Sequence, residues 1–402
     1  MKNSIDRRAF LKIGALTGLS ASLPSRANEQ SEVGVNGYVR LGRTNLNISD
    51  ISFGSSQLNP GEEYLVEYAL DRGVNYIDTA DSYSRQNSER VIGNALKGKR
   101  DKVYLATKTH SDASTRKDHL MQSLDASLNR LQTDHVEIFF NHAVNSVSRL
   151  ENEEWYEFVA LARRQGKLLY TGLSGHAGNL IECCDFALDN DLVDVLLLAH
   201  NFGQDPVFYE KFTRSFDMVA VQPDLPRVMA KAKKKDVGVI AMKVLRGARL
   251  NDMRPFEQGG YTYAQAAFKW ALSSPYIDAS IISMTSTAKI DEFLAASGQR
   301  GITQADFELL EQYARLTHMS YCNHACNDCS GACPYGVPMS DVLRTRMYAT
   351  DYGNLKFARD EYALLGQSAQ ACLSCDGKPC RDACTQGINI AQLCGPTHVM
   401  LS

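Results

Sequence analysis

Positive charge is not in excess in this sequence, and long apolar runs are missing. The 43 Lys and Arg residues are matched by 46 Asp and Glu residues, which gives a formal net charge of −3. Without a basic excess, the composition does not favour binding to nucleic acid or to an anionic membrane surface. The apolar run Ile13–Leu23 is too short to cross the roughly 30 Å core of a bilayer, so no stable membrane span is expected.

Cysteine is scarce in most of the chain. Of the 11 cysteines, only Cys183 and Cys184 precede residue 320, and their helical surroundings favour a packing role. The sequence also lacks a G-x-G-x-x-G turn after its first apolar run, which disfavours an open doubly wound sheet. It carries no signature of a flavin site.

Residues 1–30 combine a basic start, a short apolar stretch and a small-residue exit, which are the three parts of a signal peptide. Arg7 and Arg8, followed by Phe-Leu-Lys, resemble a twin-arginine signal, although Asp6 stands where Ser or Thr is usual. We therefore expect a twin-arginine signal peptide, the twin-arginine export machinery as a partner, and a periplasmic or otherwise exported protein. A basic amphipathic N-terminus is the alternative.

Between residues 37 and 300, eight short apolar runs alternate with helix-like stretches such as Arg116–Leu131. Strands that are each followed by a helix predict a parallel sheet, and eight such units predict an α/β fold, a (β/α)8 TIM barrel. An open doubly wound sheet is the alternative. The expected strands are Ile51–Gly54, Val74–Asp78, Val103–Thr107, Val136–Asn141, Leu168–Ser174, Val193–Ala199, Val237–Met242 and Ala279–Ser283.

The composition changes near residue 318 to cysteine, glycine and small polar residues. We expect a barrel over residues 37–300, a connector helix over 301–317 and a small cysteine-rich domain over 318–402. Within that domain, Ser340–Leu365 is compatible with helix and separates two runs of cysteines.

Reactive side chains follow three consecutive predicted strands, at the barrel end where active sites of this fold lie. Tyr83 would give a proton to a carbonyl oxygen as hydride reaches the carbon, and Lys108 would lower its pKa. Asp78 would hold Lys108, and His142 would hydrogen-bond the developing oxyanion. Taken singly, each is as readily a cap, a solvated charge or a packing residue. His110 is interpreted as a loop residue.

Five motifs of the barrel region form a set: Tyr38–Thr44, Gly73–Ala80 with Tyr83, Glu89–Gly93, Leu105–Lys108 and Tyr170–Ser174. With them, residues 37–300 resemble the aldo/keto reductase superfamily. The resemblance implies reversible NADP- or NAD-dependent hydride transfer to an aldehyde, ketone or sugar, so the substrate is a small-molecule carbonyl or alcohol. It implies the catalytic residues Asp78, Tyr83, Lys108 and His142.

The same resemblance places the dinucleotide at the later strand ends. Leu197 stands where the sixth strand usually carries Gln, and Ile290 stands where an Arg often binds the 2′-phosphate. Lys289 is a substitute for that Arg, so NAD and NADP both stay open. The expected cofactor-binding residues are Ser174, Asn201, Met242, Lys243, Leu245, Ser283, Thr285 and Lys289.

The two cysteine runs approach the C-x2-C-x2-C-x3-C-P pattern of two-cluster ferredoxins, in which the fourth cysteine ligates the other cluster. We therefore expect a ferredoxin-like domain with two [4Fe–4S] clusters. Two zinc ions or disulfides are the alternatives, and Cys394 has no assigned partner. One cluster would take Cys322, Cys326, Cys329 and Cys384, and the other Cys372, Cys375, Cys380 and Cys333.

The clusters have either a structural role or an electron-transfer role with an electron-carrier protein as partner. The leading interpretation is an aldo/keto reductase-type oxidoreductase. The alternative is an electron-transfer or redox-sensing iron–sulfur protein with a catalytically degenerate barrel, because Leu197 and Ile290 depart from the usual cofactor site.

Overall fold

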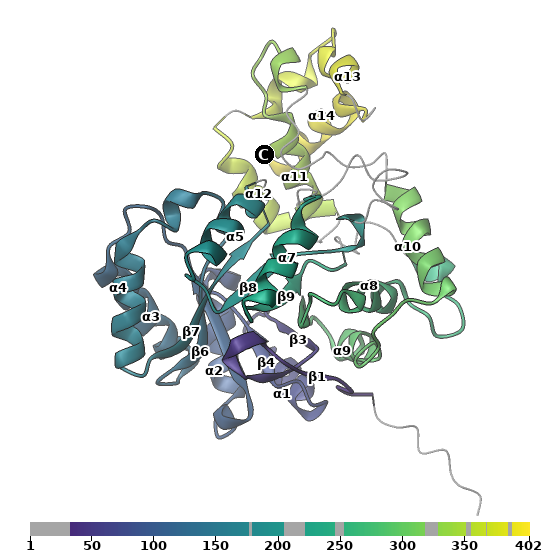
Figure 1. Ribbon diagram of the computed structural model, residues 1–402. Coiled ribbons are helices and arrows are strands. Elements are labelled where there is room, and N and C mark those ends of the chain that lie inside the picture. Colours follow the sequence, from purple (N-terminus) through teal and green to yellow (C-terminus); the bar gives the residue numbers. More distant parts are fainter. Residues whose placement is uncertain are drawn as a thin grey trace, which may run out of the picture. The chain divides into compact units, whose positions relative to one another are not determined.

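The computed structural model describes residues 33–402 apart from 177–178, 205–221, 246–252, 318–328, 351–354, 367 and 385–387. Eight parallel strands close into a barrel with the order β10-β3-β4-β5-β6-β7-β8-β9 (Figure 1). This closure confirms the predicted barrel and excludes the open sheet, because β10 pairs with both β3 and β9. The strands are β3 Ile51–Gly54, β4 Tyr76–Asp78, β5 Tyr104–Thr109, β6 Val136–Asn141, β7 Leu168–Gly175, β8 Val195–Ala199, β9 Gly238–Met242 and β10 Ala279–Ser283.

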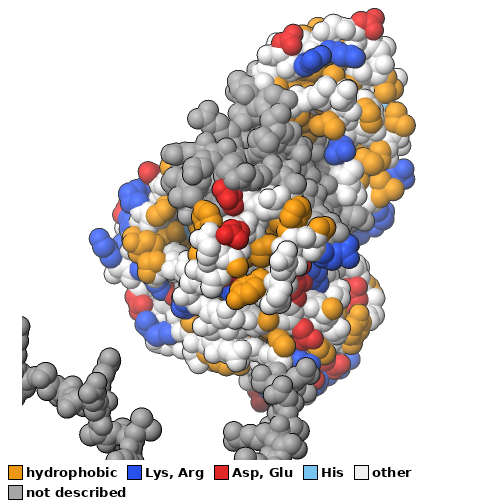
Figure 2. Space-filling view, turned by 90° about the vertical axis from the view of Figure 1, so that its right-hand side faces the viewer, with side chains coloured by type: hydrophobic (Ala, Val, Ile, Leu, Met, Phe, Trp, Pro, Cys, Tyr) orange, Lys and Arg blue, Asp and Glu red, His pale blue; other side chains and the backbone are white. Residues whose placement is uncertain are grey.

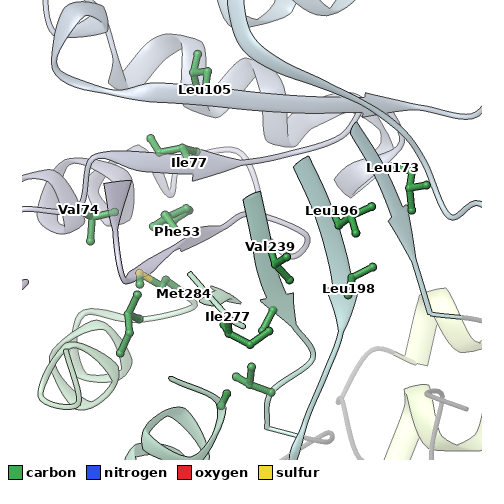
Figure 3. Packing of buried hydrophobic residues seen from close by; sticks show 14 of the residues in the cluster. Phe53, Val74, Ile77, Leu105, Leu173, Leu196, Leu198, Val239, Ile277 and Met284 are labelled. Carbon is green, nitrogen blue, oxygen red and sulfur yellow. The ribbon is translucent and has the colours of Figure 1, made fainter. Parts of the chain in front are cut away.

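The strands carry two apolar layers, because successive residues of a strand point to opposite faces. Phe53, Ile77 and Leu105 belong to the outer layer, between strands and helices (Figure 3). The inner layer fills the barrel, so side chains rather than a channel occupy its centre. An active site can therefore lie only at the ends of the strands. Members of the inner layer are Tyr76, Ala106, Ile138, Phe140, Val195, Leu197, Ile240 and Ile281.

A hairpin closes the barrel at the end where the strands begin. Strands β1 (Tyr38–Arg40) and β2 (Asn47–Ser49) pair antiparallel, and Leu41 between them packs into the inner layer. Gly42 has φ +46°, and an added Cβ would lie 2.3 Å from the backbone nitrogen of Gly238. Only glycine fits this close approach, so Gly42 lets the hairpin pack against the start of β9.

Nine described helices accompany the barrel strands and the segment after them. Their apolar faces contribute to the outer layer, as Leu120, Leu124 and Leu128 of α3 do. The last helix, α10, lies within the expected connector and is tied to α8 by a buried pair, Lys269 Nζ to Asp306 Oδ1 at 3.1 Å. The helices are α1 Glu63–Asp71, α2 Asn87–Ala95, α3 Lys117–Leu131, α4 Glu153–Arg164, α5 Leu180–Asp189, α7 Leu225–Lys234, α8 Tyr263–Ser273, α9 Thr287–Leu294 and α10 Gln304–Thr317.

The described part of the C-terminal segment consists of helices and turns around an apolar cluster of its own. Val342, Ala358, Ile390 and Cys394 are fully or almost fully buried in this cluster. Contacts group Val33–Ser402 into one compact unit. The helices are α11 Met339–Thr350, α12 Leu355–Ala363, α13 Pro379–Ala383 and α14 Ile390–Leu401.

The charge distribution and the lengths of the described helices both agree with the composition. Acidic and basic side chains are interspersed over the face shown in Figure 2, as the net charge of −3 suggests. Within the described ranges, none of the helices has both the length and the apolar character needed to cross a membrane.

His200 is a buried titratable group of the barrel. It follows β8, is 5% exposed and lies against Trp270, with ring centroids 4.9 Å apart. Neither of its ring nitrogens has a hydrogen-bond partner among the described residues. Burial lowers the pKa of His200 to about 4, so the ring is neutral in the folded state near pH 7.

We expect this histidine to weaken the fold in acid. In the unfolded chain the pKa of a histidine returns to about 6.5. Below that pH the unfolded state therefore binds a proton that the folded state does not bind. Lowering the pH from 7.5 to 5 should remove about 2 kcal/mol of unfolding free energy through His200 alone. His200→Phe should lack that part of the pH dependence, which denaturant unfolding at the two pH values measures. The exposed residue His119, changed to Gln, is the control, and an equal pH dependence in His200→Phe and the wild type would contradict the prediction.

Candidate active site

A buried ion pair joins the second and third barrel strands at their carboxyl ends. Asp78 ends β4, and Lys108 lies near the end of β5, where Asp78 is paired with Ala106. Lys108 Nζ donates to Asp78 Oδ1 at 2.5 Å and to the carbonyl oxygen of Thr79 at 2.5 Å. Both side chains are 1% exposed. Burial lowers the pKa of Lys108, but Asp78 and Tyr83 outweigh it and the net pKa is raised, so Lys108 stays charged.

Tyr83 lies on the short turn that follows β4. Lys108 Nζ is 3.5 Å from its hydroxyl and 4.8 Å from its ring centroid. The sequence predicts that Lys108 lowers the pKa of Tyr83. Lys108 does act in that direction, but burial acts more strongly and Asp78 adds to it, so the net pKa is raised. Tyr83 is therefore held protonated, as a proton donor must be.

His142 completes the group from the end of β6. Its ring meets the Tyr83 ring edge to face, with centroids 5.8 Å apart. Burial, followed by the charge of Lys108, lowers the pKa of His142 to about 2. The imidazole is therefore neutral and offers one N–H to a hydrogen-bond acceptor. The four residues expected to act together thus lie together at one rim.

The residues expected to bind a dinucleotide lie on the remaining arc of the same rim, at or just after the ends of β7, β8, β9 and β10. Ser174 Oγ accepts from the backbone nitrogen of Ala143 at 2.9 Å. Asn201 Oδ1 accepts from the backbone nitrogen of Gly203 at 3.0 Å, and Asn201 Nδ2 donates to the carbonyl oxygen of Lys243 at 3.4 Å. The Ser174 bond ties the end of β7 to the segment after β6, and the Asn201–Lys243 bond ties the segment after β8 to the segment after β9.

The other residues expected to bind the cofactor differ in their solvent exposure. Met242 ends β9 half-buried, whereas Leu245 is buried and its carbonyl oxygen accepts from Tyr263. Ser283 Oγ lies 2.6 Å from Ser56 Oγ, and Thr285 is half-buried two residues later.

The start of α9 has the features of a phosphate site, with one exception. Ser286 caps the helix by accepting from the backbone nitrogen of Lys289, and free N–H groups of a first turn attract anions. The Lys289 side chain, however, is paired with Glu292 at 2.5 Å. Ile290 is fully buried in the core, so it serves packing where the family often has an Arg.

The departure from the family pattern at β8, where Leu197 replaces the usual Gln, has a similar explanation. Leu197 is fully buried in the inner layer of the barrel, so it fills the barrel where a Gln is usual. Ser174 and Asn201, by contrast, are buried polar side chains, so hydrogen-bonding groups of the kind that a dinucleotide needs are present at the ends of β7 and β8.

Four cysteines from both runs share one neighbourhood. The pKa of Cys372 is raised by burial and then by Cys333, Cys380 and Cys375, which requires that these thiols lie near one another. In the part of the chain that the structure describes, no set of three or more His, Cys, Asp or Glu side chains has metal-site geometry. Cys322 and Cys326 lie outside the described residues.

Two residues beside His142 were not predicted as site residues from the sequence. His110, interpreted as a loop residue, has its ring centroid 5.1 Å from that of His142. Arg149 is 9% exposed and donates to the carbonyl oxygens of Ala143 and His142 at 2.7 and 2.8 Å. The position of His110 directly after a predicted strand could have marked it as a residue of the rim, whereas no local sequence pattern marks Arg149.

Comparisons with known proteins agree on one family. The sequence model of the aldo/keto reductase family matches residues 50–259. The uncharacterized oxidoreductase YqkF of Bacillus subtilis is 22% identical over 301 residues, which are 69% of this chain and 96% of YqkF. Oxidoreductase YrpG of the same organism is 28% identical over 237 residues, 53% of this chain and 68% of YrpG. The solved structure of the aldo-keto reductase AKR11C1 from Bacillus halodurans in its holo form has a TM-score of 0.53 at 20% identity, over 68% of this chain and 95% of that one.

The ion pair at the rim makes a testable contribution to stability. Asp78→Asn leaves the buried ammonium of Lys108 without its carboxylate, and breaking such a pair typically costs about 3–5 kcal/mol. The double variant Asp78→Asn with Lys108→Met removes both charges and should regain most of that loss. Both tryptophans, Trp155 and Trp270, lie in barrel helices, so their fluorescence during denaturant unfolding reports on the barrel. A double variant as unstable as Asp78→Asn alone would contradict this account.

Proposed function

This chain belongs to the aldo/keto reductase family and is an oxidoreductase of that type, and we propose that it catalyses reversible NAD(P)-dependent hydride transfer to the carbonyl of an aldehyde, ketone or sugar. The observation that carries this proposal is the contact of Tyr83 with Lys108, 3.5 Å between hydroxyl and Nζ, above the buried pair with Asp78. A degenerate barrel would have no need to keep two buried charges at that place.

Each residue has one role in the proposed reaction. When bound, a reduced nicotinamide supplies the hydride, that is, both electrons, to the carbonyl carbon. Tyr83 gives its hydroxyl proton to the carbonyl oxygen, so that the C=O becomes CH–OH. Lys108 stabilises the tyrosinate that remains until a proton returns from solvent, and the neutral imidazole of His142 donates a hydrogen bond to the oxygen as its negative charge grows. In the oxidative direction, the ionised Tyr83 accepts the proton of the alcohol.

The choice between NAD and NADP stays open in this proposal. In this proposal, Ser174 and Asn201 bind the nicotinamide side of the cofactor, and Ser283, Thr285 and the N-terminus of α9 bind its phosphates. A fixed bidentate Arg is the usual basis for selecting a 2′-phosphate. Lys289 is the candidate cation here, and its pairing with Glu292 weakens the case for NADP.

We also propose that the C-terminal segment is a ferredoxin-like domain with two [4Fe–4S] clusters. Supporting it is the neighbourhood of Cys333 with Cys372, Cys375 and Cys380, because this set combines three thiols of one run with the last thiol of the other. That crossed set is the one expected of a two-cluster ferredoxin. The second set depends on Cys322 and Cys326 and rests on spacing alone.

Export is a separate proposal, which rests on Arg7 and Arg8 and on the apolar run after them. A cluster has to be assembled before the protein enters an oxidising compartment, and the twin-arginine route carries folded proteins. The proposed signal peptide and the proposed clusters therefore explain each other.

Replacement of the proton donor tests the proposed reaction. Tyr83→Phe should lower turnover of a carbonyl substrate by at least about 100-fold, the usual contribution of a general acid. The same variant should keep the fluorescence of bound NAD(P)H and the iron–sulfur absorbance of anaerobically prepared protein. The exposed residue Tyr64, changed to Phe, is the matched control. Turnover that survives in Tyr83→Phe would rule out this assignment.

Metal analysis tests the C-terminal proposal. Anaerobically purified protein should contain about eight iron atoms and about eight acid-labile sulfides, as expected for two [4Fe–4S] clusters. Cys375→Ala should lose about half of both, whereas Cys183→Ala, which changes a buried cysteine of α5, should keep them. Stoichiometric zinc without sulfide would contradict the iron–sulfur proposal.

A further inference from the structure

A buried carboxylate holds β5 from the outer face of the barrel. Glu89, in the first turn of α2, is fully buried. Its Oε1 accepts from Thr107 Oγ1 at 2.6 Å, and its Oε2 accepts from Arg130 Nε at 2.6 Å. Thr107 directly precedes Lys108 on β5, and adjacent residues of a strand point to opposite faces. Glu89 therefore fixes the strand at Lys108 from the side opposite to the Lys108 side chain.

The residue before Glu89 acts on the ammonium end of the same lysine. Ser88 is fully buried, and its Oγ lies 2.9 Å from Thr79 Oγ1 and 2.7 Å from Ser55 Oγ. The carbonyl oxygen of the same Thr79 accepts from Lys108 Nζ. Two adjacent residues of α2 thus contact the neighbours of both the backbone and the ammonium of Lys108.

Tyr83 is joined to α2 by a turn of unusual backbone geometry. The three residues Ser84–Gln86 have φ values of +47°, +56° and +69°, which are strained for residues other than glycine. A strained turn persists only where the surrounding structure holds it in place. Before the turn, the backbone nitrogen of Asp81 donates to the carbonyl oxygen of Lys108 at 3.1 Å. After the turn, the buried side chains of the first turn of α2 provide the second attachment.

Packing alone does not account for the pair of Glu89 with Arg130. Their side chains are 0% and 10% exposed, so both charges have lost most of their hydration. Apolar residues of similar size in place of such a pair are often neutral or stabilising. The proposed chemistry, in contrast, benefits from reacting groups that are held at a fixed separation.

We propose that Glu89 is a positioning residue of the proposed reaction, which fixes the place of Lys108 by holding Thr107. The 3.5 Å between Lys108 Nζ and the Tyr83 hydroxyl then depends on α2, to which both residues are attached. Glu89 acts through Thr107 rather than by touching the reacting atoms, so its loss should lower kcat without raising KM. This inference rests on the proposed function for the role of Tyr83.

Thr107→Val tests the proposal with a small change. Valine has nearly the shape of threonine and suits a strand, but it gives Glu89 no hydroxyl donor. The variant should lower kcat for carbonyl reduction at least about tenfold and leave KM within about twofold, because a displaced reacting group slows the chemical step. Thr171→Val is the matched control, because it too removes a hydroxyl bond within a barrel strand, to the carbonyl oxygen of Phe139. An unchanged kcat in Thr107→Val, or an equal loss in Thr171→Val, would overturn the proposal.

Two double variants separate the hydrogen-bond acceptor of Glu89 from its charge. Glu89→Gln with Arg130→Met removes both charges but keeps an amide oxygen that accepts from Thr107. Glu89→Leu with Arg130→Met removes the acceptor as well. The first should keep most of the wild-type kcat, and the second should lose as much as Thr107→Val. Equal kcat values in the two double variants would contradict the role of the acceptor, and if the second does not fold, Thr107→Val decides.

A measurement without turnover distinguishes this proposal from the proposed function. In protein labelled with ¹⁵N-lysine, the Lys108 ammonium hydrogens should exchange slowly with solvent, and Lys108→Met assigns their signal. Exchange should be at least about tenfold faster in Thr107→Val, because the group then opens more often, and unchanged in Thr171→Val. Equal rates in Thr107→Val and the wild type would overturn the positioning role and leave the reductase proposal standing. If the holoenzyme turns over no carbonyl compound, the reductase proposal falls, and the exchange rates still decide whether Thr107 holds Lys108.

Discussion

The buried ion pair between Asp78 and Lys108 is the constraint on which the candidate site depends. Two charges that are 1% exposed persist only because each satisfies the other, since an isolated ion would be too costly to bury. The pair also depends on the register of the barrel strands, because Asp78 lies opposite Ala106 and Lys108 lies two residues beyond Ala106. A one-residue slip between β4 and β5 would turn Lys108 away from the rim.

Burial and charge act in opposite directions on Tyr83, and the balance defines its role. The charge of Lys108 favours the tyrosinate, but burial and Asp78 favour the phenol, and together they prevail. The hydroxyl therefore meets a substrate with its proton in place, and Lys108 acts when the proton has left. The neutral imidazole of His142 adds a donor to the rim without adding positive charge, which would repel Lys108.

The proposed clusters and the proposed hydride transfer use electrons differently. A nicotinamide delivers two electrons together, whereas a cluster carries one, and the sequence shows no flavin site that would convert between them. The clusters therefore need no place on the path from cofactor to substrate. Five of the proposed cysteine ligands lie in or against an apolar cluster that belongs to the C-terminal segment itself, namely Cys329, Cys333, Cys372, Cys380 and Cys384. This agrees with a structural role as well as with electron transfer to a partner.

The sequence by itself determined the eight strands to within one or two residues, because each is a short apolar run bounded by polar segments. It also determined that Asp78, Lys108 and His142 share a rim, because parallel strands bring their carboxyl ends to one side. Only the tertiary structure decided the net pKa of Tyr83, which depends on how much of the chain covers it. Likewise, it alone decided that Arg149 ties the loop after β5 to the loop after β6, since its hydrogen bonds go to the backbone carbonyls of Ser111, Ala143 and His142, which no residue pattern encodes.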